Sequence, residues 1–349
     1  MTRAERALLG LVALAAVVAG VTRYVGDVSH VVAFVFATLG LAGMAWIVSF
    51  ATEQVGERFG SAVTGVLQAT VGNLPEFFVV LFALNAGELL VAQTALVGSI
   101  VVNALLVLGL VIVAGAGRSR DGIMRFSSRL PNDTATLLLV STFIIVLIGL
   151  ANAAGDLASR HTKTISIVAA SAILVAYALW LRQYLHSAKG ARGEAEPRLG
   201  TPLSLALLLA GGVASAFVSD WFVHALKPTI HTLHISRAFA GLVIVAIAGN
   251  AIEHAVGIVL AARGRSELAI AVVKNSVSQV AAFLYPLLVL VSLATATTLT
   301  FALAPVYIGA LFGTAVIVWQ ITGDGEATVF EGVALVAAFV ILATVAAFQ

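Results

Sequence analysis

Two glutamates in the middle of apolar segments are the residues best placed to do chemistry. Glu76 ends the sequence GNLPE and Glu253 ends the sequence GNAIE, 177 residues later. Each lies about 15 residues, or roughly 22 Å of helix, beyond the start of its apolar segment. A carboxylate at that depth in a membrane is costly unless it is paired, protonated or coordinated. Two facing carboxylates would repel each other, and protons or a divalent cation such as Ca²⁺ would relieve that repulsion. The pair therefore predicts a site that holds either a cation or protons. Two neutral, hydrogen-bonded carboxylic acids with a structural role are the alternative.

Amide, glycine and proline residues precede both glutamates. Asn73 and Asn250 lie three residues before them, on the same helix face, and are expected to take part in the site. Gly72, Pro75 and Gly249 favour a helix break or hinge, because proline lacks a backbone N–H and frees a carbonyl one turn earlier. Freed carbonyls are tolerated at membrane depth where they line a cavity. Tight helix packing is the alternative for the glycines, and an interhelical hydrogen bond for the asparagines.

The apolar segment after each motif carries further polar residues. Ser99 and Asn103 share one helix face, as do Ser276 and Gln279, and the two serines are again 177 residues apart. These four side chains are expected to complete an oxygen-rich pocket, with hydrogen bonding between helices as the alternative.

Four more titratable residues bear on the predicted site. His254, Glu53 and Glu331 are candidates for proton relay or gating. A neutral packed histidine and solvated loop carboxylates are the alternatives. Lys274 is expected to face away from the site and to extend its ammonium group to the cytoplasmic end of its segment.

The composition shows what kind of chain positions these residues. Of 349 residues, 60% are hydrophobic and only 10% are charged, whereas soluble domains carry about 25% charged residues. A soluble enzyme, a disordered protein and a nucleic-acid binder are excluded. The absence of cysteine excludes disulfides and thiolate metal sites. Apolar runs long enough to cross a bilayer as helices predict an all-α polytopic membrane protein with eleven spans, at 7–25, 29–50, 61–86, 91–115, 135–153, 164–186, 201–221, 237–262, 267–292, 299–321 and 329–348.

The distribution of basic residues predicts the orientation. With the N-terminus inside, the cytoplasmic segments hold thirteen Lys and Arg residues and the outer segments five, with Lys274 inside a span. We therefore expect a cytoplasmic N-terminus and an outer C-terminus, in the inner (plasma) membrane of a prokaryote. The two motifs then lie on spans of opposite direction. The chain divides into an additional N-terminal helix (1–28), a first repeat (29–186), a cytoplasmic linker (187–200) and a second, inverted repeat (201–349).

The motifs and their surroundings resemble the Ca²⁺/H⁺ exchanger family of the cation/Ca²⁺ antiporter superfamily. TEQVGERFGSAVTGVLQATVGNLPEFFVVLFAL resembles the first family repeat and ISRAFAGLVIVAIAGNAIEHAVGIVLA the second, and the likeness covers residues 30–349. The resemblance implies an eleven-span antiporter that works by alternating access. It also implies that the motif glutamates bind Ca²⁺ and protons, with the Asn, Ser and Gln side chains above lining the site.

Some positions depart from the family pattern. Asn275 stands where the family has glycine, Val102 and Val277 replace residues that are often serine, and the central linker is net basic. These changes bear on the choice of ion.

The sequence therefore predicts a cation/proton antiporter, most simply Ca²⁺/H⁺, that is not an enzyme and needs no cofactor. Its partners are inorganic cations, protons and the lipid bilayer, with no nucleic acid; the oligomeric state is left open. Na⁺/H⁺ or Na⁺/Ca²⁺ exchange on the same scaffold is the nearest alternative. A passive cation channel is disfavoured by the single glutamate pair, and an intramembrane enzyme by the lack of a nucleophile or metal triad.

Overall fold

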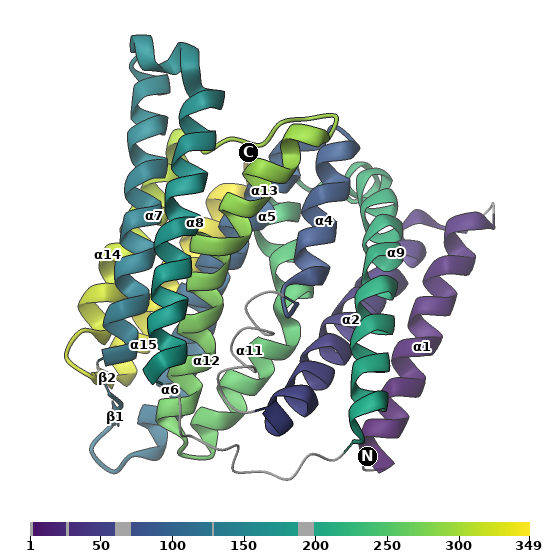
Figure 1. Cartoon of the computed structure of the whole chain (residues 1–349), viewed down its shortest axis with the longest axis horizontal. Coiled ribbons are helices and arrows are strands. Elements are labelled where there is room, and N and C mark those ends of the chain that lie inside the picture. Colours follow the sequence, from purple (N-terminus) through teal and green to yellow (C-terminus); the bar gives the residue numbers. More distant parts are fainter. Residues whose placement is uncertain (1–2, 26–27, 60–70, 128, 188–198) are drawn as a thin grey trace. The chain divides into compact units, whose positions relative to one another are not determined.

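A computed structural model of the chain describes residues 3–25, 28–59, 71–127, 129–187 and 199–349 (Figure 1). Within these ranges nine helices are long and apolar enough to cross a membrane. A tenth is added if the bent pair Arg237–Ala251 and Glu253–Ala262 counts as one span. The predicted all-α polytopic membrane fold is confirmed, but the count of eleven is not. The predicted segment 61–86 falls partly outside the described residues, and its described part is the short helix α4 (Leu74–Asn85).

Two compact units make up the chain. Unit 1 contains α1 (Arg3–Tyr24), α2 (His30–Phe59), α4 and α9 (Thr201–Leu233). Its ranges are Met1–Ala86, Ala178–Ile235 and Ala248–Asn250. Helix α9 packs along α2 and also contacts α1 and α4. These units mix residues from both predicted repeats, so they differ from the domains expected from the sequence, which stay a prediction.

Helices α2 and α9 run antiparallel. At one end, the Thr229 hydroxyl donates a hydrogen bond to the His30 carbonyl, 3.1 Å away. At the other end, Val48 and Ala51 of α2 pack with Leu208 of α9. These are the first spans of the two predicted repeats, and an inverted repeat requires them to run in opposite directions. The packing within unit 1 thus supports the inverted repeat.

Helix α9 is longer than its predicted span, 201–221. It continues to Leu233, for 33 residues, or about 50 Å at 1.5 Å per residue, against a hydrocarbon thickness of about 30 Å. The extra turns carry polar residues such as His224, Lys227 and His231. The predicted span ended before these polar residues because hydropathy measures how well a segment suits lipid. It does not measure whether the segment forms a helix.

Unit 2 holds most of the second half of each predicted repeat. Its ranges are Gly87–Tyr177, Ser236–Ile247 and Ala251–Gln349. Helix α7 packs on α12 and α14, and α15 packs on α6. The elements in chain order are α5 (Leu89–Val101), η1 (Val102–Val107), α6 (Leu108–Arg118), β1 (Ile123–Arg125), α7 (Arg129–Ala153), η2 (Leu157–His161), α8 (Thr162–Ser187, up to Tyr177), α10 (Arg237–Phe239), η3 (Ala240–Val245), α11 (Ala246–Ala262, without 248–250), α12 (Ser266–Gln279), η4 (Val280–Leu284), α13 (Tyr285–Val291), η5 (Ser292–Ala294), α14 (Pro305–Thr322), β2 (Glu326–Thr328) and α15 (Val329–Ala347).

Wide helical turns occur at equivalent places in the two predicted repeats. The π-helical segments η1 and η4 each interrupt the span that follows a motif, and their last residues, Val107 and Leu284, are 177 apart. The Arg118 guanidinium at the end of α6 donates to the carbonyl of Ala262, the last residue of α11, so these two helices meet at ends that are both predicted to be cytoplasmic. Single-turn π segments interrupt helices mostly at functional sites. Here η1 contains the predicted site residue Asn103, and η4 directly follows Gln279.

A two-stranded antiparallel sheet corrects the purely helical prediction. Strands β1 and β2 pair in the register Met124 with Ala327. The Arg125 guanidinium bridges Asp121 at 2.7 Å and Glu326 at 3.1 Å. The Ser119 hydroxyl first, and then Arg125, lowers the pKa of the Asp121 carboxyl to about 2. Each strand has only three residues, too few for an alternating pattern to show in the sequence.

The loops of unit 2 meet in two groups that match the predicted sides of the membrane. The paired strands join two connections that are both predicted to be cytoplasmic. Near the predicted outer ends, Arg237 pairs with the buried Glu88 at 3.5 Å. There the Ser236 hydroxyl also donates to the Ala346 carbonyl. Within unit 2, loops predicted to lie on the same side of the membrane therefore contact one another.

Candidate functional site

Glu76 lies in a close hydrogen-bonded arrangement inside unit 1. Its side chain is 6% exposed, and its Oε1 accepts a 2.5 Å hydrogen bond from the Asn250 amide. Asn250 belongs to the other motif, so the contact joins residues from both predicted repeats. Asn73, which precedes α4 as its N-cap residue, is also buried. Three of the predicted site residues are thus buried in one unit.

Gly249 makes this arrangement possible. A Cβ atom at this position would lie 2.9 Å from the Glu76 Cγ atom, which is closer than side-chain carbons approach one another. The missing side chain therefore lets the GNAIE backbone come next to the Glu76 side chain. For Gly249 the structure shows close packing, and the predicted hinge role remains a proposal.

The position of Glu76 along its helix differs from the prediction. The sequence placed it about 15 residues into a continuous segment, whereas α4 begins at Leu74 and Glu76 stands in its first turn. Pro75 explains this start, since proline suits the first turn, where its missing N–H costs no helical hydrogen bond. The Pro75 carbonyl accepts a hydrogen bond from Ser219 on α9. The positive end of the α4 dipole favours a negative charge on Glu76.

Glu253 has different surroundings in unit 2. Its span is bent by 68° between Ala251 and Glu253, so this glutamate also begins the second part of a broken span. Ser276 is its polar neighbour. Within the part of the chain that the structure describes, the Glu253 Oε2 atom and the Ser276 hydroxyl are buried and form no well-aligned hydrogen bond. The Glu253 carboxyl therefore keeps acceptor capacity for a proton or a cation.

The remaining predicted ligands are buried in unit 2. Ser99, Asn103 and Gln279 are all less than 9% exposed. The Asn103 amide donates to the Ser99 carbonyl at 2.9 Å, while its Oδ1 oxygen has no partner among the described residues. Asn103 lies inside η1, and Gln279 is the residue directly before η4. Ser99 and Asn103 are thus brought together, as predicted, but through a backbone carbonyl.

The three predicted relay residues differ in setting. His254 is buried, and its Nε2 atom has no hydrogen-bond partner within the described ranges. Glu53 is exposed on α2. Glu331 accepts hydrogen bonds from the Thr328 amide and hydroxyl and closes a capping box at the start of α15. The pattern Thr-x-x-Glu predicts such a cap, and the cap accounts for Glu331 without any relay role.

Lys274 contradicts its predicted position. It is 2% exposed, and its Nζ atom is buried without a hydrogen-bond partner in the described part of the chain. The ammonium group therefore does not reach the cytoplasmic end of the span. Helix α12 is covered by α7 and α6, and this packing closes the route along which a lysine on an exposed helix would extend.

The helical fold and the buried carboxyl and amide groups within its spans define a polytopic membrane transporter. The chain belongs to the sodium/calcium exchanger protein family, whose sequence model matches residues 29–182 and 203–348. The match leaves out α1 and the central linker.

Two relatives cover most of the chain. A vacuolar calcium ion transporter of Schizosaccharomyces pombe is 33% identical over 318 residues, which cover 88% of this chain and 77% of the relative. The Ca²⁺/H⁺ antiporter ChaA of Bacillus subtilis is 29% identical over 333 residues, covering 91% of this chain and 93% of the relative.

Solved structures share the fold. The structure of native YfkE matches with a TM-score of 0.80 and 25% identity, covering 98% of this chain and 99% of the other. The H⁺/Ca²⁺ exchanger CAX matches with a TM-score of 0.75 and 14% identity, covering 99% and 93%. The second likeness, at this low identity, concerns the fold alone.

Proposed function

We propose that this protein is a secondary active Ca²⁺/H⁺ antiporter that works by alternating access. The observation that carries the proposal is the hydrogen bond from the Asn250 amide to the buried Glu76 carboxyl, which joins the two motifs at membrane depth. A membrane protein retains a buried carboxyl group at a cost, and such groups mark ion and proton pathways. The two relatives described above are named as calcium transporters, one of them as a Ca²⁺/H⁺ antiporter.

Glu76 and Glu253 carry the exchange in this proposal. Each carboxyl group can hold one proton, so two protons neutralise the same negative charge as one Ca²⁺. The protein cannot readily pass through its closed state while the site is empty, because two unprotonated carboxylates would then be buried without a counter-charge. The exchange of Ca²⁺ is therefore coupled to that of protons. Carboxylate and amide oxygens are the ligands that Ca²⁺ prefers. In this proposal amide and hydroxyl oxygens of the predicted site residues complete the coordination shell.

Ca²⁺-driven proton movement in inverted membrane vesicles tests the function. Addition of Ca²⁺ should dissipate an imposed pH gradient, and Glu76→Gln or Glu253→Gln should abolish the response. Glu326→Gln is the matched control, because it removes a carboxylate from the exposed loop sheet. A response to Na⁺ alone would overturn the choice of Ca²⁺. Unchanged activity of both Gln variants would contradict the assignment of Glu76 and Glu253 to the ion-binding site.

The orientation belongs to the same proposal: an inner-membrane protein with its N-terminus in the cytoplasm and its C-terminus outside. The chain has no cysteine, so single cysteines can report sidedness without background. Arg160→Cys should react with a membrane-impermeant reagent added outside intact cells, and Arg120→Cys only after lysis. The reverse pattern would overturn the orientation.

A further inference from the structure

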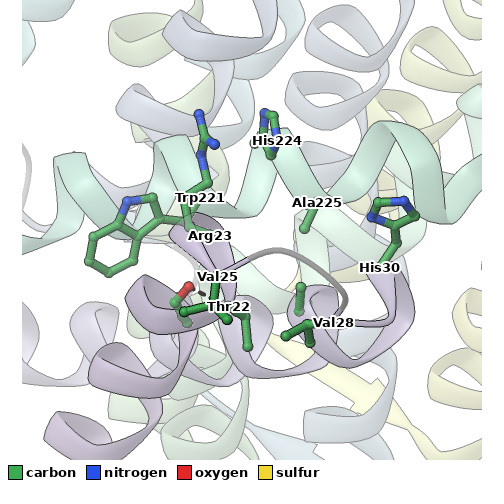
Figure 2. Close-up of a pocket in the computed structure, with 10 residues that line it drawn as sticks. Thr22, Arg23, Val25, Val28, His30, Trp221, His224 and Ala225 are labelled. Carbon is green, nitrogen blue, oxygen red and sulfur yellow. Dashed lines mark hydrogen bonds between the residues drawn. The ribbon is translucent and has the colours of Figure 1, made fainter.

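A cationic pocket lies in unit 1, away from the motif glutamates. Its volume is about 160 Å³, and it is bounded by the end of α1, the start of α2 and the middle of α9. Figure 2 shows Arg23 and His224 pointing the same way from α1 and α9, with Trp221 beside Arg23 and His30 on the far side. No step of ion exchange described above uses these residues.

The polar atoms of the pocket are mainly donors. Arg23 Nε and Trp221 Nε1 are buried, and neither has a hydrogen-bond partner among the described residues. Both groups can only donate, and leaving a buried donor without an acceptor is costly. The lining also includes His224 and His30, whose rings bring further N–H groups. The pocket therefore suits a ligand that is anionic and rich in acceptor oxygens.

Packing holds the donors in place. The Trp221 ring lies against Gly20 of α1, where a Cβ atom would come within 2.9 Å of the indole. The Arg23 guanidinium lies 5.5 Å from the centre of the Tyr24 ring. The hydrogen bond from Thr229 to the His30 carbonyl fixes the start of α2 against α9. The site is thus built from three helices rather than from a loose surface chain.

The pocket lies where the first two predicted spans, 7–25 and 29–50, are connected. Helix α1 ends at Tyr24, directly after Arg23, and α2 begins at His30. Trp, Tyr and Arg are typical of the headgroup level of a bilayer. Ala19, Val25, Val28 and Ala33 supply apolar walls. A phosphate group attached to an apolar body satisfies both the donors and these walls.

We propose that this pocket binds a phosphate group, supplied by the headgroup of an anionic phospholipid. Arg23 and Trp221 donate to the phosphate oxygens, and His224 and His30 add donors at the rim. Free inorganic phosphate shares this chemistry and is the other source to be distinguished. The proposal is independent of the transported ion.

Lipid binding to the purified full-length protein, measured by native mass spectrometry, tests it. Phosphatidylglycerol should bind saturably, and diacylglycerol, which lacks the phosphate, should not. Arg23→Gln should weaken phosphatidylglycerol binding about 10-fold or more through loss of a charge-assisted hydrogen bond. Arg23→Lys should retain most of the binding. Arg160→Gln, which removes a charge from an exposed site in unit 2, should have no effect.

Inorganic phosphate separates the two sources. If it binds the wild type with the same dependence on Arg23 while phosphatidylglycerol does not, the pocket is a phosphate site and the lipid assignment is wrong. If phosphatidylglycerol binds and millimolar phosphate does not displace it, the lipid is the ligand. Equal phosphatidylglycerol binding by wild type and a correctly folded Arg23→Gln protein would overturn the proposal. So would diacylglycerol binding as well as phosphatidylglycerol, or failure of both phosphatidylglycerol and phosphate to bind.

Discussion

Glu76 and Glu253 end the same motif but have unlike surroundings. Glu76 stands in the first turn of α4 and accepts a short hydrogen bond from Asn250. Glu253 follows a bend in its span, and its Oε2 atom is buried without a hydrogen-bond partner among the described residues. In this arrangement the Asn250 NH2 group donates to Glu76, whereas the hydroxyl of Ser276 can donate or accept by a rotation of its O–H bond alone.

This difference separates two roles within one pair. The Asn250 amide fixes the Glu76 carboxyl through a short hydrogen bond to its Oε1 atom. Glu253 has a neighbour that adapts to either protonation state. We therefore expect Glu76 to hold the geometry of the site and Glu253 to change partners more readily during exchange. The predictions below test whether this asymmetry is real.

Shortening each glutamate by one methylene group should have the largest unequal effect. Glu76→Asp withdraws the carboxyl from Asn250 and should lower the Ca²⁺-driven proton flux about 10- to 100-fold, the value of one hydrogen bond to a charged group. Glu253→Asp should lose less, because no comparable bond fixes its position. Flux in inverted vesicles at matched protein levels measures both. Equal reductions in flux for the two variants, or a larger reduction for Glu253→Asp, would contradict the proposed difference between the two glutamates.

Filling the space beside Glu76 should disturb the site without changing a charge. Gly249→Ala places a Cβ atom 2.9 Å from the Glu76 Cγ atom, so one of them must shift. We expect a flux reduction of about 10-fold, in the range that crowding of a packed interior costs. Gly309→Ala is the matched control, because a Cβ atom there meets open space. The close approach at Gly249 is unimportant if the two variants behave alike.

Removing the polar neighbour should again affect Glu76 more than Glu253. Asn250→Ala leaves a buried carboxyl without its amide donor and should reduce the flux about 10-fold, the lower end of the value of one hydrogen bond to a charged group. Ser276→Ala should cost less, since the hydroxyl makes no well-aligned bond among the described residues. Initial rates over a series of Ca²⁺ concentrations distinguish weaker binding from slower turnover. A larger effect of Ser276→Ala would reverse the assigned roles.

The smallest transport effect is expected at Lys274. Its Nζ atom is buried and has no hydrogen-bond partner in the described ranges, so Lys274→Met removes a costly group and keeps a similar volume. The melting temperature of the purified protein should stay the same or rise, with little change in flux. A clear fall in melting temperature, with Arg160→Gln unchanged, would show that the ammonium group stabilises unit 2.

The sequence predicted the helical membrane fold, most span positions and the two motifs, because hydropathy and repeated polar residues are local signals. It did not predict the Asn250–Glu76 bond, since an internal repeat shows equivalence and not which residues meet. The start of α4 at Leu74 could have been inferred from Pro75, which suits a first helical turn. The capping role of Glu331 could also have been predicted, because Thr328 stands three residues before it and the two form a capping-box pattern.

Other features depend on packing that the pattern does not contain. Hydropathy cannot distinguish an α-helical turn from the wider turns of η1 and η4, because hydropathy depends on residue type and not on the backbone hydrogen-bond pattern. The burial of Lys274 depends on the helices that cover α12, and the strand pair depends on two loops about 200 residues apart. Such features become visible only when the tertiary neighbours are known.

The paired π segments also bear on how the chain arose. A π turn holds about one residue more than an α-helical turn, which is the change that inserting one residue into an α-helix would produce. The segments η1 and η4 end 177 residues apart, the same interval that separates the two motif glutamates. One insertion in an ancestral half-length gene, copied when that gene was duplicated, accounts for both more simply than two separate events. The wide turn is in that view older than the full-length chain.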